Sequence, residues 1–171
     1  MADHYVDVVN EKDEVIGKEL KNKKPELGFI SRVVAILIRD NEGKFIVCKR
    51  EGHKKVDAEK YDLSAFGNVK VGEDYQQAAI RELQEELNIQ CPLNMLDKFY
   101  QEIDYKDCKA KIFCGVFVGH TNDTPKLNHE VSSFRKMSLE EIEKEMERNP
   151  NKFCQGFIND FSQVKNKLKE I

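Results

Sequence analysis

The chain has 171 residues, of which 28 are basic and 31 acidic, and its formal net charge is −3. This balance lacks the excess of Lys and Arg that neutralises a phosphate backbone, so a stable nucleic-acid complex is not expected. The length suits a single domain over residues 1–171, and the 40% apolar residues can fill its core, which excludes disorder as the main state.

The cysteine pattern indicates reduced thiols. The 5 cysteines are an odd number and show no C-x-x-C spacing, so neither a disulfide framework nor a zinc ribbon is indicated.

The first residues, MADHYVDVVNEKDE, contain no apolar signal segment, and no later apolar run approaches the ~20 residues that span a bilayer. We therefore expect a cytoplasmic protein with no membrane partner.

The N-terminal region predicts a β-hairpin over about residues 5–20, because two β-type runs flank the polar turn 11–14. The basic stretch 21–25 ends this pattern. An apolar run, Val33–Ile38, then predicts a strand that is buried on both faces, and we expect it to pair with Phe45–Cys48 through a short turn. A charged loop follows over residues 52–60.

The middle of the chain predicts a glycine-bearing loop and a helix. A short strand-like segment at residues 61–64 precedes the loop at 67–72. The helix covers Asp74–Leu87, because its apolar residues fall within one arc of ~100° when successive residues turn by ~100°.

The C-terminal half predicts three strands and two helices. Two β runs, 95–105 and 112–118, flank a turn at 106–109, and a weaker run covers 131–137. Ser138 and Glu141 form a capping box, and the C-terminal helices cover about residues 139–169. The expected fold class is α/β (α+β), with a mixed β-sheet, helices packed on it and an N-terminal hairpin.

Three carboxylates share one face of the helix predicted over 74–87. On a helical wheel with Leu83 at zero, Glu82, Glu85 and Glu86 lie between about −160° and −60°. We expect them to point into one cleft beside the loop 67–72. Like charges spaced by four residues destabilise a helix unless a cation lies among them. The alternative interpretation is an acidic face that is simply solvated.

The spacing around these acids resembles a family motif. Gly67 is followed after five residues by Glu73, and after seven more by Arg81-Glu82-Leu83-Gln84-Glu85-Glu86-Leu87-Asn88-Ile89. This run is similar to the Nudix box, G-x5-E-x7-R-E-U-x-E-E-x-G-U, where U is apolar. Asn88 replaces the second glycine of the box, and we expect it to end the helix in the left-handed conformation that Asn tolerates.

The resemblance implies a mixed sheet between helices and a metal-dependent pyrophosphohydrolase. Such an enzyme cleaves a nucleoside diphosphate linked to another group, and oxygen ligands suit Mg²⁺ or Mn²⁺. The resemblance implies a role for each fixed position of the motif. By this resemblance, Glu82, Glu85 and Glu86 would bind the metal, and Glu73 would support the loop and the metal site. Arg81 would orient the glutamates, and Gly67 would let the backbone come close to the metal and the phosphate.

Residues outside the box are candidates for the remaining roles. Glu130 precedes the last predicted strand, where relatives place a second-site glutamate, so it is a candidate general base or auxiliary ligand; an exposed loop acid is the alternative. Arg32 and Arg50 flank the two central strands and are candidate phosphate contacts, with ordinary surface charge as the alternative. The substrate is a small-molecule diphosphate, and a homodimer is common among relatives.

Two other functions compete with hydrolysis. The N-terminal hairpin and the segment 61–64 resemble the branch of the family that contains isopentenyl-diphosphate isomerases. Those enzymes need a cysteine before the box helix, but Ser64-Ala65-Phe66 stands there, and their histidine ligands and later paired glutamates are also missing. The other alternative is a non-catalytic nucleotide-binding regulatory module, although the chain retains the box glutamates.

Overall fold

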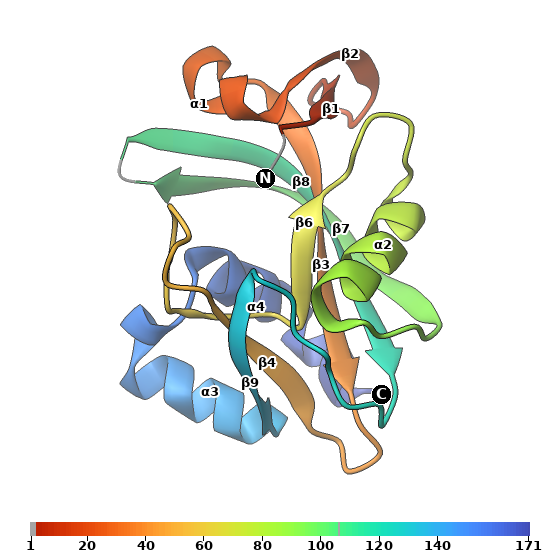
Figure 1. Ribbon diagram of the computed structural model, residues 1–171, viewed down its shortest axis with the longest axis vertical. Coiled ribbons are helices and arrows are strands. Elements are labelled where there is room, and N and C mark those ends of the chain that lie inside the picture. The colour runs from red at the N-terminus through yellow and green to blue at the C-terminus, as the bar shows by residue number, and fades with distance from the viewer. Residues whose placement is uncertain (1–2, 106) are drawn as a thin grey trace.

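A computed structural model describes residues 3–105 and 107–171, in which nine strands form one mixed sheet (Figure 1). The strands are β1 (Tyr5–Val9), β2 (Val15–Leu20), β3 (Ile30–Arg39), β4 (Phe45–Arg50), β5 (Tyr61–Asp62), β6 (Ala65–Asn68), β7 (Leu93–Tyr105), β8 (Cys108–His120) and β9 (Val131–Met137). The helices are α1 (Lys24–Leu27), α2 (Tyr75–Leu87), α3 (Leu139–Arg148) and α4 (Gln155–Lys169), with 3-10 turns η1 (Lys21–Lys23) and η2 (Pro150–Lys152). Lys106, within the turn predicted at 106–109, lies outside the described residues.

The sheet is built around β3. This strand pairs in parallel with β8 from Ile30↔Lys111 to Arg39↔His120, and it pairs antiparallel with β6. The strands predicted at 33–38 and 45–48 do pair, but only next to their turn, where the described register of β3 with β4 consists of Arg39↔Phe45. Beyond that pair β4 diverges from β3 and joins β9 and β5. Pairing over long sequence separations thus displaces the local hairpin.

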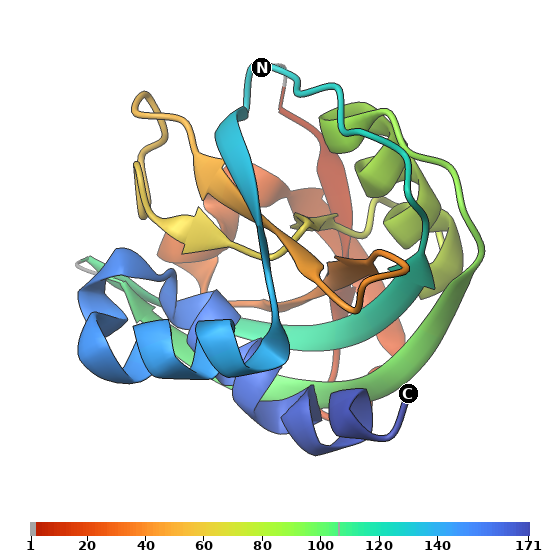
Figure 2. The same ribbon diagram turned by 90° about the horizontal axis from the view of Figure 1, so that it is seen from below.

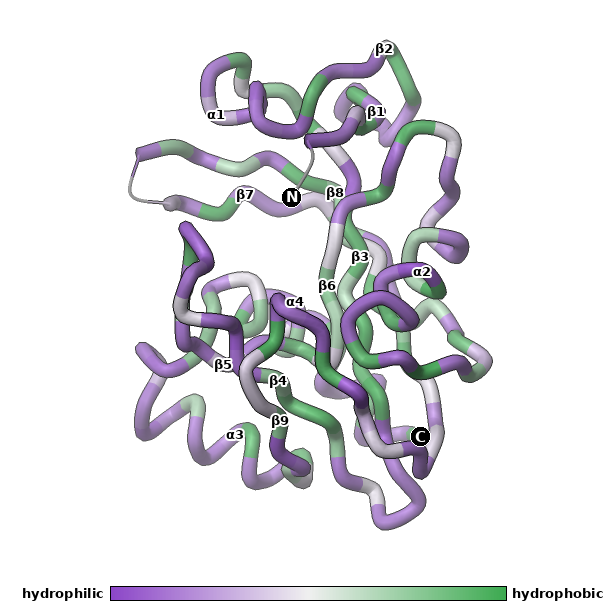
Figure 3. Tube along the Cα trace, in the orientation of Figure 1, coloured by the Kyte–Doolittle hydropathy of each residue, from purple (hydrophilic) through white to green (hydrophobic). Residues whose placement is uncertain are grey.

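Side chains of β3 alternate between two buried layers. Val34, Ile36 and Ile38 pack in the layer that contains the apolar face of α2. Val33, Ala35 and Leu37 pack in the other layer, with the apolar face of α4. Figure 2 shows the curved β7–β8 ribbon with α3 and α4 on one side and α2 on the other. The sheet between helices is therefore confirmed, and Figure 3 shows apolar residues concentrated along its inner strands.

The helix ends follow local sequence signals. Asp74 accepts from the Gln77 N–H in a capping box, and Asn88 ends α2 with φ of 54°, as predicted from its place in the box. Ser138 caps α3 in the same way. The C-terminal helices predicted over about 139–169 are α3 and α4, with the turn η2 between them. The short helix α1 was not expected, because Pro25 reads as a breaker although proline fits the first helical turn.

The N-terminal hairpin is confirmed as β1 and β2, which pair from Tyr5↔Leu20 to Val9↔Val15. In Figure 1 it lies at one end of the molecule, above the loop that leads into α2. No helix among the described residues has both the length and the apolar character needed to cross a membrane.

Candidate active site

The first glycine of the box lies on a strand. Gly67 belongs to β6 and pairs with Val34, so its placement in a loop over 67–72 is wrong. A Cβ atom at this position would lie 2.0 Å from Cδ of Glu82. Only a residue without a side chain leaves space for that carboxylate against the β6 backbone.

Arg81 connects the loop, the strand and the helix. Its Nε donates to Glu73 Oε1 at 2.6 Å, and its Nη2 donates to Glu73 Oε2 at 2.9 Å. Nη1 donates to Glu82 Oε1 at 2.6 Å and to Glu85 Oε2 at 3.3 Å. Nη2 also donates to the carbonyl of Asn68 at 2.8 Å. The guanidinium therefore fixes the glutamates relative to the end of β6.

The three helix carboxylates differ in exposure. Glu82 and Glu86 are buried, each at 8% exposure, whereas the side chain of Glu85 is 49% exposed. Two of the three carboxylates are thus buried, whereas Glu85 lies at the surface. The apolar arc of α2 packs on the sheet, so positions next to that arc are drawn inward.

Burial and like charge act on these acids together. Burial raises the pKa of Glu86 well above its usual range, and Glu82, Asp62 and Glu130 raise it further. Burial also raises the pKa of Glu82, although Arg81 opposes this. Glu86 forms no salt bridge with any residue in the described part of the chain. The cluster is therefore short of positive charge.

Glu130 and Asp62 complete the acidic cluster. Glu130, the candidate general base or auxiliary ligand, forms an ion pair with Lys54, and its side chain is 20% exposed. Burial would raise the pKa of Glu130, but the hydrogen bond from Lys54 holds it below its usual range. The sequence did not indicate Lys54 and Asp62, because neither lies in a motif. The pairing of β4 with β9 and β5 brings these two residues close to the box glutamates.

The two candidate phosphate contacts are paired with other groups. Arg32 donates from Nε to Asp13 Oδ1 at 2.7 Å, in a cluster formed with the N-terminal hairpin. Arg50 donates from Nη1 to Asp62 Oδ2 at 3.1 Å and from Nε to the carbonyl of Val56 at 3.2 Å. Arg50 is therefore linked to the acidic cluster through Asp62, whereas Arg32 is linked to the hairpin through Asp13.

The donor set suits a hard divalent cation. The cluster offers carboxylate oxygens, which Mg²⁺ and Mn²⁺ prefer. Within the described residues, no group of three or more acidic, His or Cys side chains is already arranged to hold a metal. Ion pairs to Arg81 hold two of the candidate ligands, Glu82 and Glu85. Glu86 is buried and forms no salt bridge within the described residues, and this observation fits a divalent cation at the site.

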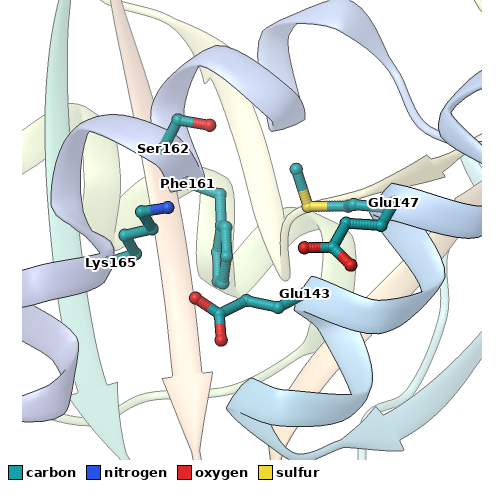
Figure 4. Close-up of a pocket in the computed structure, with 6 residues that line it drawn as sticks. Glu143, Glu147, Phe161, Ser162 and Lys165 are labelled. Atoms are coloured by element: carbon teal, nitrogen blue, oxygen red, sulfur yellow. The ribbon is translucent and has the colours of Figure 1, made fainter.

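Two surface hollows lie away from these acids. One, of about 380 Å³, is lined by Gln84, Asn88, Gln90 and Asp123 at the end of α2. The other, of about 240 Å³, lies between α3 and α4, and Figure 4 shows Glu143 and Glu147 facing Lys165 across it. Neither hollow contains a box glutamate, so neither forms part of the candidate active site.

Comparison with known proteins identifies the family. The NUDIX domain profile matches residues 30–157. An uncharacterized Nudix hydrolase of Streptomyces coelicolor is 38% identical over 86 residues, which are 50% of this chain and 48% of that protein. This chain thus spans about half the length of that relative.

Other relatives match over more of the chain. Isopentenyl-diphosphate Delta-isomerase 2 of Photorhabdus laumondii is 30% identical over 139 residues, 80% of this chain and 78% of that protein. The crystal structure of DR0079 from Deinococcus radiodurans superposes with a TM-score of 0.73 at 26% identity, covering 85% of this chain and 90% of that one. These matches confirm the family resemblance and, at the level of the family, the prediction of a Nudix-type hydrolase. The chain belongs to the Nudix hydrolase family.

Proposed function

We propose that the chain is a divalent-metal-dependent pyrophosphohydrolase that acts on a nucleoside diphosphate linked to another group. The observation that carries this proposal is Glu86, a buried carboxylate without a salt bridge in the described residues and close to other acids. Such a group raises the free energy of the folded protein unless a cation neutralises it. A cation there would also reduce the repulsion between the acidic cluster and an anionic diphosphate.

The residues that would hold the metal are the box acids Glu82, Glu85 and Glu86, with Glu73 in support. When bound, Mg²⁺ or Mn²⁺ supplies charge neutralisation at the diphosphate and activation of the attacking water. Arg81 orients the cluster, because it binds Glu73 and Glu82 at once.

Three further residues have proposed roles near the reacting groups. Gly67 leaves room for the carboxylate of Glu82 against the β6 backbone, and it is retained as the point where the backbone comes close to the metal and the phosphate. Glu130 is assigned as general base or auxiliary ligand, with its carboxylate kept ionised by Lys54 and thus able to accept a proton. Arg50, linked to the cluster by Asp62, is retained as a phosphate contact.

The second candidate function, isomerisation, is favoured by the similarity to two isopentenyl-diphosphate isomerases over most of the chain. The residue chemistry opposes it. Ser64 is one of the three residues, 64–66, among which the cysteine position falls. Its hydroxyl donates to the carbonyl of Ile46 at 2.6 Å while accepting from Ile38 N–H at 2.8 Å. Cys48 is buried and donates to the carbonyl of Ser64 at 3.2 Å, and burial raises the pKa of its thiol.

A substrate screen tests hydrolysis against both alternatives. Nucleoside di- and triphosphates, sugar nucleotides, dinucleoside polyphosphates and dinucleotide cofactors would each be incubated with Mg²⁺ or Mn²⁺. Release of phosphate, pyrophosphate or a nucleoside monophosphate is the expected result. Conversion of isopentenyl diphosphate without phosphate release would support the isomerase, and nucleotide binding without turnover of any compound would support a regulatory module.

Three finer expectations remain predictions within this proposal. Activity should appear with Mg²⁺ or Mn²⁺ and disappear with a chelator. The five cysteines are free in the structure, in keeping with the cytoplasmic setting predicted from the sequence. The homodimer also remains a prediction, which sedimentation of the purified protein would test.

A further inference from the structure

The turn of the N-terminal hairpin contains a buried, fully bonded carboxylate. Asp13 has a φ of 62°, and its side chain is only 5% exposed. Oδ1 accepts from Arg32 Nε at 2.7 Å, and Oδ2 accepts from Lys98 Nζ at 2.7 Å and from Tyr75 Oη at 2.9 Å. Arg32 Nη2 also donates to the carbonyl of Asp13 at 2.6 Å.

The three donors come from three different elements. Arg32 belongs to β3 and Lys98 to β7, so these two residues attach the hairpin to the sheet. Tyr75 is the first residue of α2, and both cations lie 5.4 Å from the centre of its ring. The ring lies against Gly115, where a Cβ would be 2.8 Å from Tyr75 Cδ1. The tyrosine hydroxyl therefore connects the hairpin turn to the start of α2.

The hairpin holds the segment before α2 at a second point. Val6 of β1 forms an antiparallel bridge with Lys70, and Val71 N–H donates to the carbonyl of Tyr5 at 3.3 Å. Lys70 N–H in turn donates to Glu73 Oε2 at 2.9 Å. The hairpin thus contacts the chain on both sides of Glu73, at residues 70–71 and at residue 75.

Glu73 is the residue through which this support reaches the acidic cluster. Its two oxygens accept two hydrogen bonds from Arg81, and Arg81 binds Glu82 with its remaining nitrogen. Displacement of residues 70–75 would therefore move Glu73, then Arg81, then the carboxylate of Glu82. The hairpin itself precedes residues 30–157, which the family profile matches.

We infer that the N-terminal hairpin is a positioning element for the candidate active site, with Asp13 as its positioning residue acting through Tyr75 on the start of α2. This inference rests on the proposed function for its effect on turnover, but its structural effect does not require a substrate. The pair Val9↔Ile30 and the bonds from Arg32 and Lys98 attach the hairpin to the rest of the sheet. The bond from Tyr75 adds the attachment to the helix that carries the glutamates.

Tyr75→Phe tests this inference most directly, because it removes the bond to Asp13 and leaves both cation pairs in place. Asp13→Asn is the second variant, which weakens all three bonds. Tyr100→Phe is the matched control, since Tyr100 Oη donates to Glu102 Oε1 at 2.8 Å on the surface of β7. Two measurements use the protein without substrate: amide hydrogen exchange over residues 68–75 and the affinity for Mn²⁺.

In Tyr75→Phe, exchange over residues 68–75 should become about tenfold faster, as loss of a bond to a charged group predicts, and the melting temperature should fall by about 2–4 °C. Mn²⁺ affinity should fall several-fold, and kcat should fall while KM changes little. Tyr100→Phe should match the parent in every measurement. Unchanged exchange in Tyr75→Phe, or an increase spread evenly over the chain, would overturn the inference. The parent protein could also hydrolyse no compound while Tyr75→Phe still alters exchange and Mn²⁺ affinity. That result would support the positioning role and contradict the proposed function.

Discussion

The two faces of the sheet bury carboxylic acids in different surroundings. On the α2 face, Glu82 and Glu86 lie together, and Glu130 and Asp62 add further negative charge. On the α4 face, Asp160 is buried among apolar side chains and accepts from Gln101 Nε2 at 2.7 Å. The α2 face therefore gathers several acids of like charge, whereas the α4 face contains one acid that can remain neutral.

This difference separates two roles for a buried acid. Burial raises the pKa of Asp160 to about 7, and Asp160 Oδ2 has no hydrogen-bond partner in the described residues. Neutrality removes most of the cost of burying it. Glu86 has several acidic neighbours, so protonating one acid leaves the others in repulsion. Removal of the charge should consequently affect activity on the α2 face and stability on the α4 face.

The largest expected effect is on the α2 face, at Glu86. Glu86→Gln should lower turnover of a confirmed substrate by 100-fold or more, about 2.7 kcal/mol of barrier, because a metal ligand is lost. Melting temperature without metal should stay equal or rise, since repulsion is relieved. Glu147→Gln on the exposed face of α3 is the control. Full activity of Glu86→Gln would contradict the metal-site assignment.

The next effect is on the α4 face and concerns pH. The unfolded chain ionises Asp160 near its ordinary pKa of 3.8, whereas the folded protein keeps it neutral up to about pH 7. The contribution of Asp160 to the free energy of unfolding is therefore fully present below about pH 4, and it decreases as pH rises to about 7. Between pH 5 and pH 8, the parent should lose about 2 kcal/mol relative to Asp160→Asn in urea unfolding.

Asp97→Asn is the control for this titration. Burial would raise the pKa of Asp97, but hydrogen bonds from Gln163 and the Lys98 N–H hold it below its usual range. Its contribution is present above the unfolded pKa and decreases only at lower pH, so it should not change between pH 5 and pH 8. A parent whose pH dependence matches that of Asp160→Asn would show that Asp160 ionises normally.

A smaller effect is expected at the strand beneath the glutamates. Gly67→Ala should lower turnover about tenfold, because the added Cβ displaces the carboxylate of Glu82. Gly17→Ala on β2 is the matched control, since nothing lies within 4 Å of a Cβ built there. Equal kcat in Gly67→Ala and the parent would show that the position of Glu82 does not limit the reaction.

The smallest effect is expected from the thiols. Replacement of all five cysteines by Ser or Ala should leave at least a tenth of the hydrolytic activity, with any loss due to packing at Cys48 or Cys114, which are buried. A folded cysteine-free protein that binds metal and diphosphate but turns nothing over would make a thiol catalytic. That outcome would restore the isomerase as a candidate.

Local sequence signals predicted local elements well. The hairpin, α2, β9 and α3 depend on turn residues, helical periodicity and caps within the segment itself. Strand partners that lie far apart in the sequence could not be predicted in this way, because an apolar run such as Val33–Ile38 can pair with any other. The partners of β3 in the described residues include β8, far away in the sequence.

In the candidate site, too, residues within a local motif could be predicted and residues brought in by distant strand pairing could not. The spacing of the box was sufficient to predict that Glu73, Arg81 and the helix acids lie near one another. Lys54 and Asp62 carry no motif, so only the pairing of β4 with its neighbours reveals them. The sequence indicated that the Arg32 side chain lies near a central strand, but it did not indicate that Arg32 binds the buried Asp13.

The parallel pairing of β3 with β8 also has a kinetic consequence. Residues about 80 positions apart must meet before Ile30↔Lys111 and the following pairs form, and β4 with β9 has a similar separation, as at Arg50↔Val131. Chain closure over such spans is slow, whereas α2 can form within about a microsecond. After dilution from denaturant, helical circular dichroism should therefore return first, and Mn²⁺ binding should return only when the sheet is complete.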